Sequence, residues 1–306
     1  MSNTERVDKS LFEEEHYLGK PADANDLLVR RRIALLEDFL PFWEGDNLLE
    51  IGCGNGNTVL PLSKKFTRSI GLEYADVHKR EYEQLRNQLG VTNSKFETWD
   101  ILSGPYSFNS SAVDSQLGAE KNALDELGEE KVPMAELEDN KGLTDTLGEI
   151  KAPTEETISA GKLADRLISF EVIEHLPSED GVRNYAESLK MGGIAAISVP
   201  NKWWIFETHG ANLPLLPWNR VPFFSWLPRP FHERWSHARI YTRKRIVKLL
   251  EKHGFEILKV QYVTAPMDVV KWKPLQSFLR NWVFRGNSTA NPFKAVSILV
   301  FCKRIR

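Results

Sequence analysis

Two carboxylates and an imidazole lie close together in the sequence FEVIEHLP. Glu171 lies three residues before Glu174 and four before His175, so a helical turn that begins at Glu171 would place all three on one face. An imidazole beside carboxylates is suited to remove a proton from a hydroxyl group as a general base. His175 is therefore the first candidate for a catalytic or substrate-positioning residue, and a simple hydrogen bond to a loop is the alternative.

A second group of candidate residues is the glycine-rich stretch LLEIGCGNGNTV. Gly52, Gly54 and Gly56 follow an apolar run and let the backbone approach a ligand, because glycine has no side chain and tolerates positive φ. A dinucleotide-binding loop would have its third glycine at the position of Asn57. No lysine or arginine occurs from 52 to 62, which disfavours a phosphate-binding loop.

Three acidic residues lie at the ends of predicted strands. Glu50 precedes the glycine loop, Glu73 ends the second strand and Asp100 follows the third. The carboxyl ends of the first strands form the ligand crevice of an open α/β sheet. Carboxylates in that crevice accept hydrogen bonds from ribose hydroxyls and from an adenine amino group. Without positive charge in the loop, they predict an adenosine that carries no phosphates.

The elements that position these residues alternate along the chain. Strands are expected at 47–51, 68–73, 95–99, 166–170 and 194–199, and helices at 26–40, 58–66, 77–89 and 181–189. This order predicts right-handed crossovers and a mainly parallel sheet covered on both faces. A helix at 241–253 and a final antiparallel pair of strands, 255–263 and 295–302, are expected to follow.

An acidic repeat interrupts this pattern after the third strand. The units AVDSQLGAEK, NALDELGEEK, VPMAELEDNK and GLTDTLGEIK follow one another with a period of ten residues. Residues 110–160 hold 13 Asp and Glu against 4 Lys, a formal charge of −9, so the rest of the chain carries +7 of the total of −2. High charge and few bulky apolar residues predict a disordered insertion at 103–162 within a single domain, 1–306. A docking element for an unidentified protein partner is the alternative.

Composition predicts a cytoplasmic protein. Cys53 and Cys302 are the only cysteines, which argues against a disulfide framework and favours a reducing compartment. The N-terminal residues are polar and acidic and lack the apolar core of a signal peptide. No run of about 18 uncharged apolar residues is present to span a bilayer.

Residues 201–235 are rich in proline and hold five of the nine tryptophans. The density of proline argues against a regular helix or a central strand here. The segment is a candidate acceptor loop with three alternatives: packing on its own domain, a lid or membrane contact over a lipid-like acceptor, or a surface that stacks nucleic-acid bases. Nucleic acid is disfavoured because the chain has no dense basic stripe.

Five stretches together resemble the motifs of class I S-adenosylmethionine-dependent methyltransferases: LLEIGCGNG, IGLEY, WDI, ISFEVIEHLP and LKMGGIAAISVPN. They cover about residues 48–201 and follow the order of that family. The chain most resembles its type 11/12-like members, and the E-x-x-E-H pattern resembles ubiquinone-pathway O-methyltransferases. The resemblance implies a Rossmann-like α/β fold with a mostly parallel seven-stranded sheet. The decapeptide insertion is the main departure from the family.

The same resemblance implies S-adenosylmethionine as the cofactor and assigns residues to it. The methionine part would pass over Gly52, Gly54 and Gly56, with Glu50 near its amino group. The remaining contacts would come from Glu73 to the ribose, Asp100 to the adenine amino group, Tyr74 and Trp99 to the ring, and Phe170 and Glu171 to the sulfonium end.

The resemblance also implies methyl transfer, and the aromatic segment 201–235 favours a small, hydrophobic or amphiphilic acceptor, methylated at oxygen if His175 is the base. His209 and His237 are alternative bases. A metal-free reaction is the first expectation, but Glu171, Glu174, His175 and His237 together resemble the cation site of magnesium-dependent small-RNA 2'-O-methyltransferases, where a metal would lower the pKa of the hydroxyl. A third reading is a non-catalytic scaffold that keeps the fold, against which the intact glycines and acids count.

Overall fold

The computed structural model describes residues 26–108, 163–206, 211–213, 216–218, 222–236 and 238–306. The chain divides into two compact units, residues 1–106 with 164–306, and residues 107–163. Almost all described residues belong to the first unit. The acidic repeat, His209 and His237 lie outside the described residues, so what was expected of them stays a prediction.

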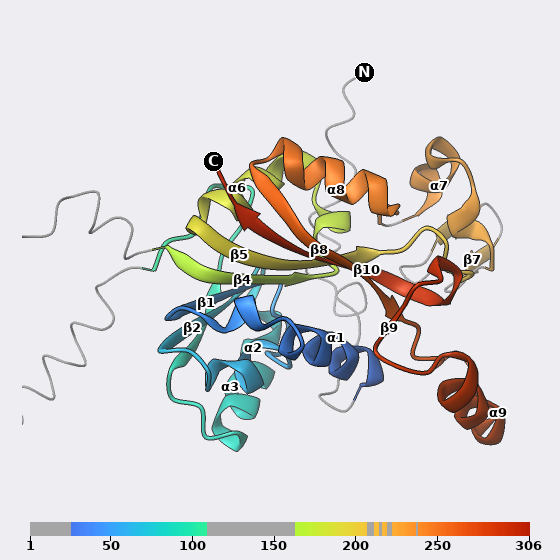
Figure 1. Cartoon of the computed structure of the whole chain (residues 1–306), viewed down its shortest axis with the longest axis horizontal. Coiled ribbons are helices and arrows are strands. Elements are labelled where there is room, and N and C mark those ends of the chain that lie inside the picture. Colours follow the sequence, from blue (N-terminus) through green and yellow to red (C-terminus); the bar gives the residue numbers. More distant parts are fainter. Residues whose placement is uncertain (1–25, 109–162, 207–210, 214–215, 219–221, 237) are drawn as a thin grey trace, which may run out of the picture. The chain divides into compact units, whose positions relative to one another are not determined.

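The first unit is built on one sheet with the strand order β3-β2-β1-β4-β5-β10-β8-β9 (Figure 1). Its strands are β1 (Asn47–Ile51), β2 (Arg68–Glu73), β3 (Ser94–Thr98), β4 (Ala164–Phe170), β5 (Leu189–Pro200), β8 (Phe255–Thr264), β9 (Ser288–Thr289) and β10 (Ala295–Arg304). The first five are parallel, whereas β10 pairs antiparallel with both β5 and β8. The strand order reverses between β1 and β4, which is where such sheets bind ligands.

The predicted Rossmann-like, mostly parallel sheet is confirmed. β1 and β2 have the predicted bounds, because each is a short apolar run that ends where the polypeptide turns. The final antiparallel pair is β8 with β10. The difference is β9, a two-residue strand that adds an eighth member at the edge through β8.

Helices cover both faces of the sheet. Figure 1 shows α1, α2 and α3 on one face and α6 and α8 on the other. Their bounds are α1 (Leu27–Glu37), α2 (Val59–Ser63), α3 (Lys79–Gln88), α6 (Val182–Glu187) and α8 (Arg243–Lys252). Leu36 of α1 and Leu60 of α2 are fully buried in the same core as Leu48 of β1. This packing fixes the ends of the strands from which the site is built.

The proline-rich residues 201–235 contain a helix that their composition argued against. Helix α7 (Arg229–Trp235) has Pro230 in its first turn, where a missing backbone N–H costs no hydrogen bond. β6 (Ala211–Leu213) and β7 (Leu216–Trp218) form a separate antiparallel ladder. Within the described part of the chain, every helix is too short or too polar to cross a bilayer.

The first residues of the predicted insertion pack within the first unit. Tyr106 is 4% exposed, its backbone amide donates to Ser188 Oγ at 2.8 Å, and its hydroxyl donates to Glu97 at 2.7 Å. A buried residue with two such bonds belongs to the sheet-bearing unit, and the division between the two units falls after Tyr106.

Candidate functional site

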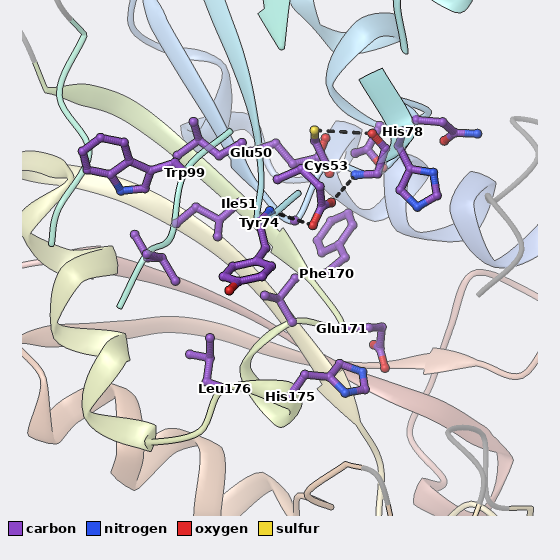
Figure 2. A pocket seen from close by; sticks show the side chains of 18 of the residues that line it. Glu50, Ile51, Cys53, Tyr74, His78, Trp99, Phe170, Glu171, His175 and Leu176 are labelled. Atoms are coloured by element: carbon purple, nitrogen blue, oxygen red, sulfur yellow. Dashed lines mark hydrogen bonds between the residues drawn. The ribbon is translucent and has the colours of Figure 1, made fainter. Parts of the chain in front are cut away.

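A cavity of about 400 Å³ lies at the carboxyl ends of β1, β2, β3 and β4. Figure 2 shows labelled side chains from these four strand ends around it. Ten of the predicted site residues line it: Glu50, Gly52, Gly54, Glu73, Tyr74, Trp99, Asp100, Phe170, Glu171 and His175. Gly56 and Glu174 do not line it, and His237 lies outside the described residues.

The three glycines of the loop differ in what a side chain at each position would meet. All have positive φ, and a Cβ at Gly52 would lie 2.3 Å from Val172 Cγ2, while a Cβ at Gly56 would lie 2.6 Å from the Tyr82 ring. A Cβ at Gly54 would meet nothing within 4 Å. Packing therefore requires glycine at the two outer positions, whereas Gly54 leaves open space on the cavity side.

Glu50 holds the start of the helix that follows the loop. It is 3% exposed, and its Oε2 accepts a hydrogen bond of 2.9 Å from the backbone N–H of Val59, the first residue of α2. Burial raises the pKa of Glu50 to about 8, and the neighbouring Glu73 also raises it, against hydrogen bonds from Val59 and Thr58 that lower it. The Glu50 carboxyl thus bonds to the loop's own backbone.

Glu73 ties the glycine loop to the end of β2. Its Oε2 accepts from the backbone N–H of Gly54 at 2.8 Å, and its Oε1 accepts from that of Tyr74 at 3.0 Å. Burial raises the pKa of Glu73, although these two bonds oppose the effect. A carboxylate has about four acceptor positions, so Glu73 retains capacity for hydroxyl donors from the cavity.

The residues after β3 supply a carboxylate and an aromatic wall. Asp100 Oδ1 accepts from the backbone N–H of Leu102 at 2.9 Å. Trp99 is 36% exposed, and its indole N–H donates to the Gly104 carbonyl at 3.2 Å. Tyr74 lines the same cavity from the end of β2. Both residues predicted to flank the ring therefore line the cavity.

Glu171 has an unusual backbone and a fixed carboxylate. Its φ of 59° lies in the left-handed region, so the helical turn predicted to begin here begins only at Ile173, in the 3-10 turn η4 (Ile173–His175). Glu171 Oε1 accepts from Arg32 Nη2 at 2.6 Å and from Ser198 Oγ at 2.9 Å. A left-handed residue of this kind costs about 1–2 kcal/mol, and at a ligand site such strain is commonly tied to function. These contacts suit a positioning role.

Glu174 and His175 have different surroundings. His175 lines the cavity, whereas Glu174 is 1% exposed and does not line it. Arg239 fixes the backbone of this segment: its N–H donates to the Glu174 carbonyl at 3.0 Å, and its guanidinium donates to the carbonyls of Leu176 and Pro177. Because φ at Glu171 breaks the helical register, the expected shared face of all three residues does not form.

The possible metal set is only partly described. Among the described residues, no group of three or more His, Cys, Asp or Glu could hold a metal ion, and His237 lies outside them. Arg239, two residues after His237, lies beside the EVIEH segment through its bond to Glu174. In the described stretches of 201–235, no residue lines the cavity.

Arg32, Cys53 and His78 also line the cavity and were not predicted. Arg32 lies in an Arg-Arg-Arg run that resembles a solvated helix face, yet it is 7% exposed. Its Nε is buried without a hydrogen-bond partner in the described part of the chain, and its guanidinium carbon lies 5.4 Å from the centre of the Phe170 ring. The signal in the sequence that could have placed Arg32 on the buried side of the helix was its spacing, because Val29, Arg32 and Leu35 are three residues apart on one face.

Comparisons with known proteins agree with this architecture. A family model described as a methyltransferase domain matches residues 25–260. An S-adenosylmethionine-dependent methyltransferase from Mesorhizobium loti superposes with a TM-score of 0.51 at 12% identity, covering 90% of this chain and 98% of that chain. The N-methyltransferase NodS from Bradyrhizobium japonicum WM9, in complex with S-adenosylhomocysteine, has a TM-score of 0.50 at 12% identity, covering 98% of this chain and 100% of that chain.

No curated protein matches this sequence. At 12% identity the two solved structures support the fold alone, whereas the family model covers more than half of the chain. The chain therefore belongs to the methyltransferase-domain family, which confirms the methyltransferase predicted from its motifs, and it shares the fold of the two solved methyltransferases.

Proposed function

We propose that this enzyme transfers the methyl group of S-adenosylmethionine to a hydroxyl of a small hydrophobic or amphiphilic acceptor. The observation that carries the proposal is that one cavity joins two kinds of lining. Gly54, Glu73 and Asp100 provide open backbone and two acceptor carboxylates on the donor side. Glu171 and His175 line the same cavity from the segment after β4.

The lining fits an adenosine donor that carries a carboxylate but no phosphate. Glu73 retains acceptor capacity for ribose hydroxyls, and Asp100 can accept from the adenine amino group. Among the described lining residues, Arg32 is the only lysine or arginine, so a single cationic group faces the donor. With a buried Nε that has no described partner, Arg32 is the residue we assign to the methionine carboxylate.

The chemistry requires alignment and proton removal. S-adenosylmethionine supplies, when bound, a methyl group that the sulfonium charge has activated. The protein must then hold an acceptor atom at near-attack distance and take up the proton of a hydroxyl. We assign proton uptake to the His175 imidazole. Glu171, held by Arg32 and Ser198, positions the acceptor hydroxyl beside it.

The remaining lining favours an apolar acceptor end. Val29, Ile101, Leu102, Leu176 and Pro177 contribute apolar side chains to the cavity. Ligand cavities typically have about 300–1,000 Å³, and this one, at about 400 Å³, must hold the donor as well. Only the reacting end of the acceptor therefore fits inside, which favours a small molecule or an amphiphile whose remainder lies outside.

The acceptor class is tested by incubating the enzyme and a cell extract with S-adenosylmethionine that carries a labelled methyl group. We expect label in the lipid or small-molecule pool, as methyl ethers. Label mainly in RNA or protein, or on nitrogen, would contradict the proposal.

Matched variants separate donor binding from transfer. Glu73→Ala and Asp100→Ala should lose affinity for S-adenosylhomocysteine in calorimetry, whereas His175→Ala should keep that affinity and lose transfer. Glu251→Ala, at an exposed position on α8, is the control and should change neither measurement. Methyl transfer by His175→Ala at the wild-type rate would contradict the assignment of His175 as the proton acceptor.

A further inference from the structure

The segment that follows β8 is unusually apolar on its exposed side. Helix α9 (Lys273–Phe278) runs into the π-helical turn η7 (Leu279–Val283), and Figure 1 shows α9 standing away from the sheet beyond β9. Four large side chains of this segment are exposed: Trp272 by 67%, Leu275 by 39%, Phe278 by 53% and Trp282 by 76%. We call these four side chains the α9 apolar face.

The other side of the same segment is firmly attached to the protein. Gln276 is buried, and its side-chain amide donates to the carbonyls of Met267 and Val270 at 3.1 Å each. Leu279 and Phe284 pack on the cluster around Trp204. The α9 apolar face is therefore held outward by specific contacts, and its exposure does not result from a loose end.

The charge around this face is positive. From Asp268 to Arg285 the sequence holds four basic residues, Lys271, Lys273, Arg280 and Arg285, against one acidic residue. Asp268 is paired with Arg280, while Lys271, Lys273 and Arg285 are exposed. Tryptophan and phenylalanine beside lysine and arginine are typical of segments that lie in the interface of a bilayer with anionic lipids.

A second exposed aromatic group lies at the same end of the sheet. Phe223 and Phe293 are 52% and 50% exposed, and both rings pack against Trp226, at 5.0 Å and 5.6 Å between centroids. Figure 1 places α7 and α9 at the end where β5 stops and β10 begins. Lys294, next to Phe293, donates to the Val283 carbonyl of η7 at 3.2 Å, which connects the two groups.

We propose that the α9 apolar face docks the enzyme on the surface of an anionic lipid bilayer. The two tryptophans and Phe278 enter the region of the head groups, where their rings leave water. Lys271, Lys273 and Arg285 then lie at the level of the lipid phosphates and attract them. The surface is built from residues outside the methyl-transfer cavity, so the proposal stands independently of the acceptor assigned above.

Vesicle co-sedimentation of the full chain tests this proposal. We expect binding to vesicles of mixed phosphatidylcholine and phosphatidylglycerol, weaker binding to phosphatidylcholine alone, and weakening by salt. The double variant Trp272→Ala/Trp282→Ala should bind at least about tenfold more weakly, because two large apolar rings no longer leave water. Lys271→Ala/Lys273→Ala should lose most of the preference for the anionic lipid.

Two controls keep the outcomes distinct. Leu40→Ala/Met191→Ala removes side chains that are 76% and 62% exposed elsewhere and should bind vesicles like the wild type. All variants should bind S-adenosylhomocysteine with unchanged affinity, so a failed donor assay and a failed docking assay are separate results. Absence of vesicle binding, or equal binding by the tryptophan variant, would overturn the proposal. A wild-type dimer that the tryptophan variant abolishes, without vesicle binding, would instead assign the face to a second copy of the chain.

Discussion

The sharpest test of the site is to place a single methyl group at two positions of the glycine loop. Gly54 and Gly56 both have positive φ, 51° and 83°, so alanine at either position carries a left-handed backbone penalty of about 1–2 kcal/mol. The two positions differ in what the new Cβ meets. At Gly56 it meets the Tyr82 ring at 2.6 Å and Leu60 at 2.7 Å, whereas at Gly54 it meets nothing within 4 Å.

This difference fixes the expected magnitudes. Gly56→Ala adds overpacking of about 1–3 kcal/mol to the backbone penalty, so its free energy of unfolding should fall by about 2–5 kcal/mol. The free energy of unfolding of Gly54→Ala should fall only by the backbone penalty. If the donor passes over Gly54, however, the methyl group occupies its path, and a comparable overpacking cost lowers donor affinity by about 5- to 150-fold.

The assays are urea unfolding for stability and calorimetry with S-adenosylhomocysteine for affinity. Gly54→Ala should lose about 1–2 kcal/mol of stability and bind poorly, while Gly56→Ala should lose about 2–5 kcal/mol. Gly54→Ala that binds the donor with wild-type affinity would refute the reasoning, because the open side of the loop would then face no ligand. Gly56→Ala with wild-type stability would show that the contact with Tyr82 relaxes without cost.

Three further predictions follow from the carboxylates and their partners. Burial raises the pKa of Glu50 to about 8, so the folded protein keeps a proton that the unfolded chain releases. The free energy of unfolding should therefore fall as pH rises toward 8, by at most about 1.4 kcal/mol per pH unit. Urea unfolding at a series of pH values should find a weaker pH dependence in Glu50→Gln. Arg32→Gln leaves the Glu171 carboxylate without its 2.6 Å partner and should lower the free energy of unfolding by about 1–3 kcal/mol in thermal unfolding. Adding Glu171→Gln should recover part of this loss. If the losses of the two single variants simply add in the double variant, the pair is not coupled. His175→Ala should lower the rate of methyl transfer by about 10²- to 10⁴-fold in a single-turnover assay, and a rate within a factor of a few of the wild type would leave His175 without a role as base.

The sheet could be predicted closely because its signals are local. β1 reads NLLEI and is buried along four of its five residues, as expected of a central parallel strand that is covered on both faces. Gly52 then ends the apolar run and marks the turn. The same logic placed Glu73 and Asp100 at the ends of neighbouring strands, so the convergence of carboxylates in one cavity needed only the strand order.

The segment after β4 was predicted less well because its geometry is not local. A helical turn from Glu171 would be the default reading, but this residue has φ of 59°, and its carboxylate bonds to Arg32 of α1 and Ser198 of β5. These contacts, one of them across more than a hundred residues of sequence, overcome the local preference. The same reason hides Arg32, whose charge is matched by a partner that sequence spacing does not reveal.

Glu50 and Glu73 illustrate how two acids at the ends of neighbouring strands come to have different roles. Both accept hydrogen bonds from backbone N–H groups around the glycines, Glu50 from Val59 and Glu73 from Gly54 and Tyr74. Glu50 is 3% exposed and bonds to the first residue of α2, so its effect is on the shape of the loop. Glu73 bonds to Gly54, the glycine with open space on the cavity side, so it shapes the loop and faces the ligand at once. Glu50→Gln should therefore retain donor affinity, because an amide oxygen still accepts from Val59. Glu73→Gln should lose affinity, because both Glu73 oxygens accept backbone N–H groups and the amide nitrogen that replaces one of them cannot accept a hydrogen bond.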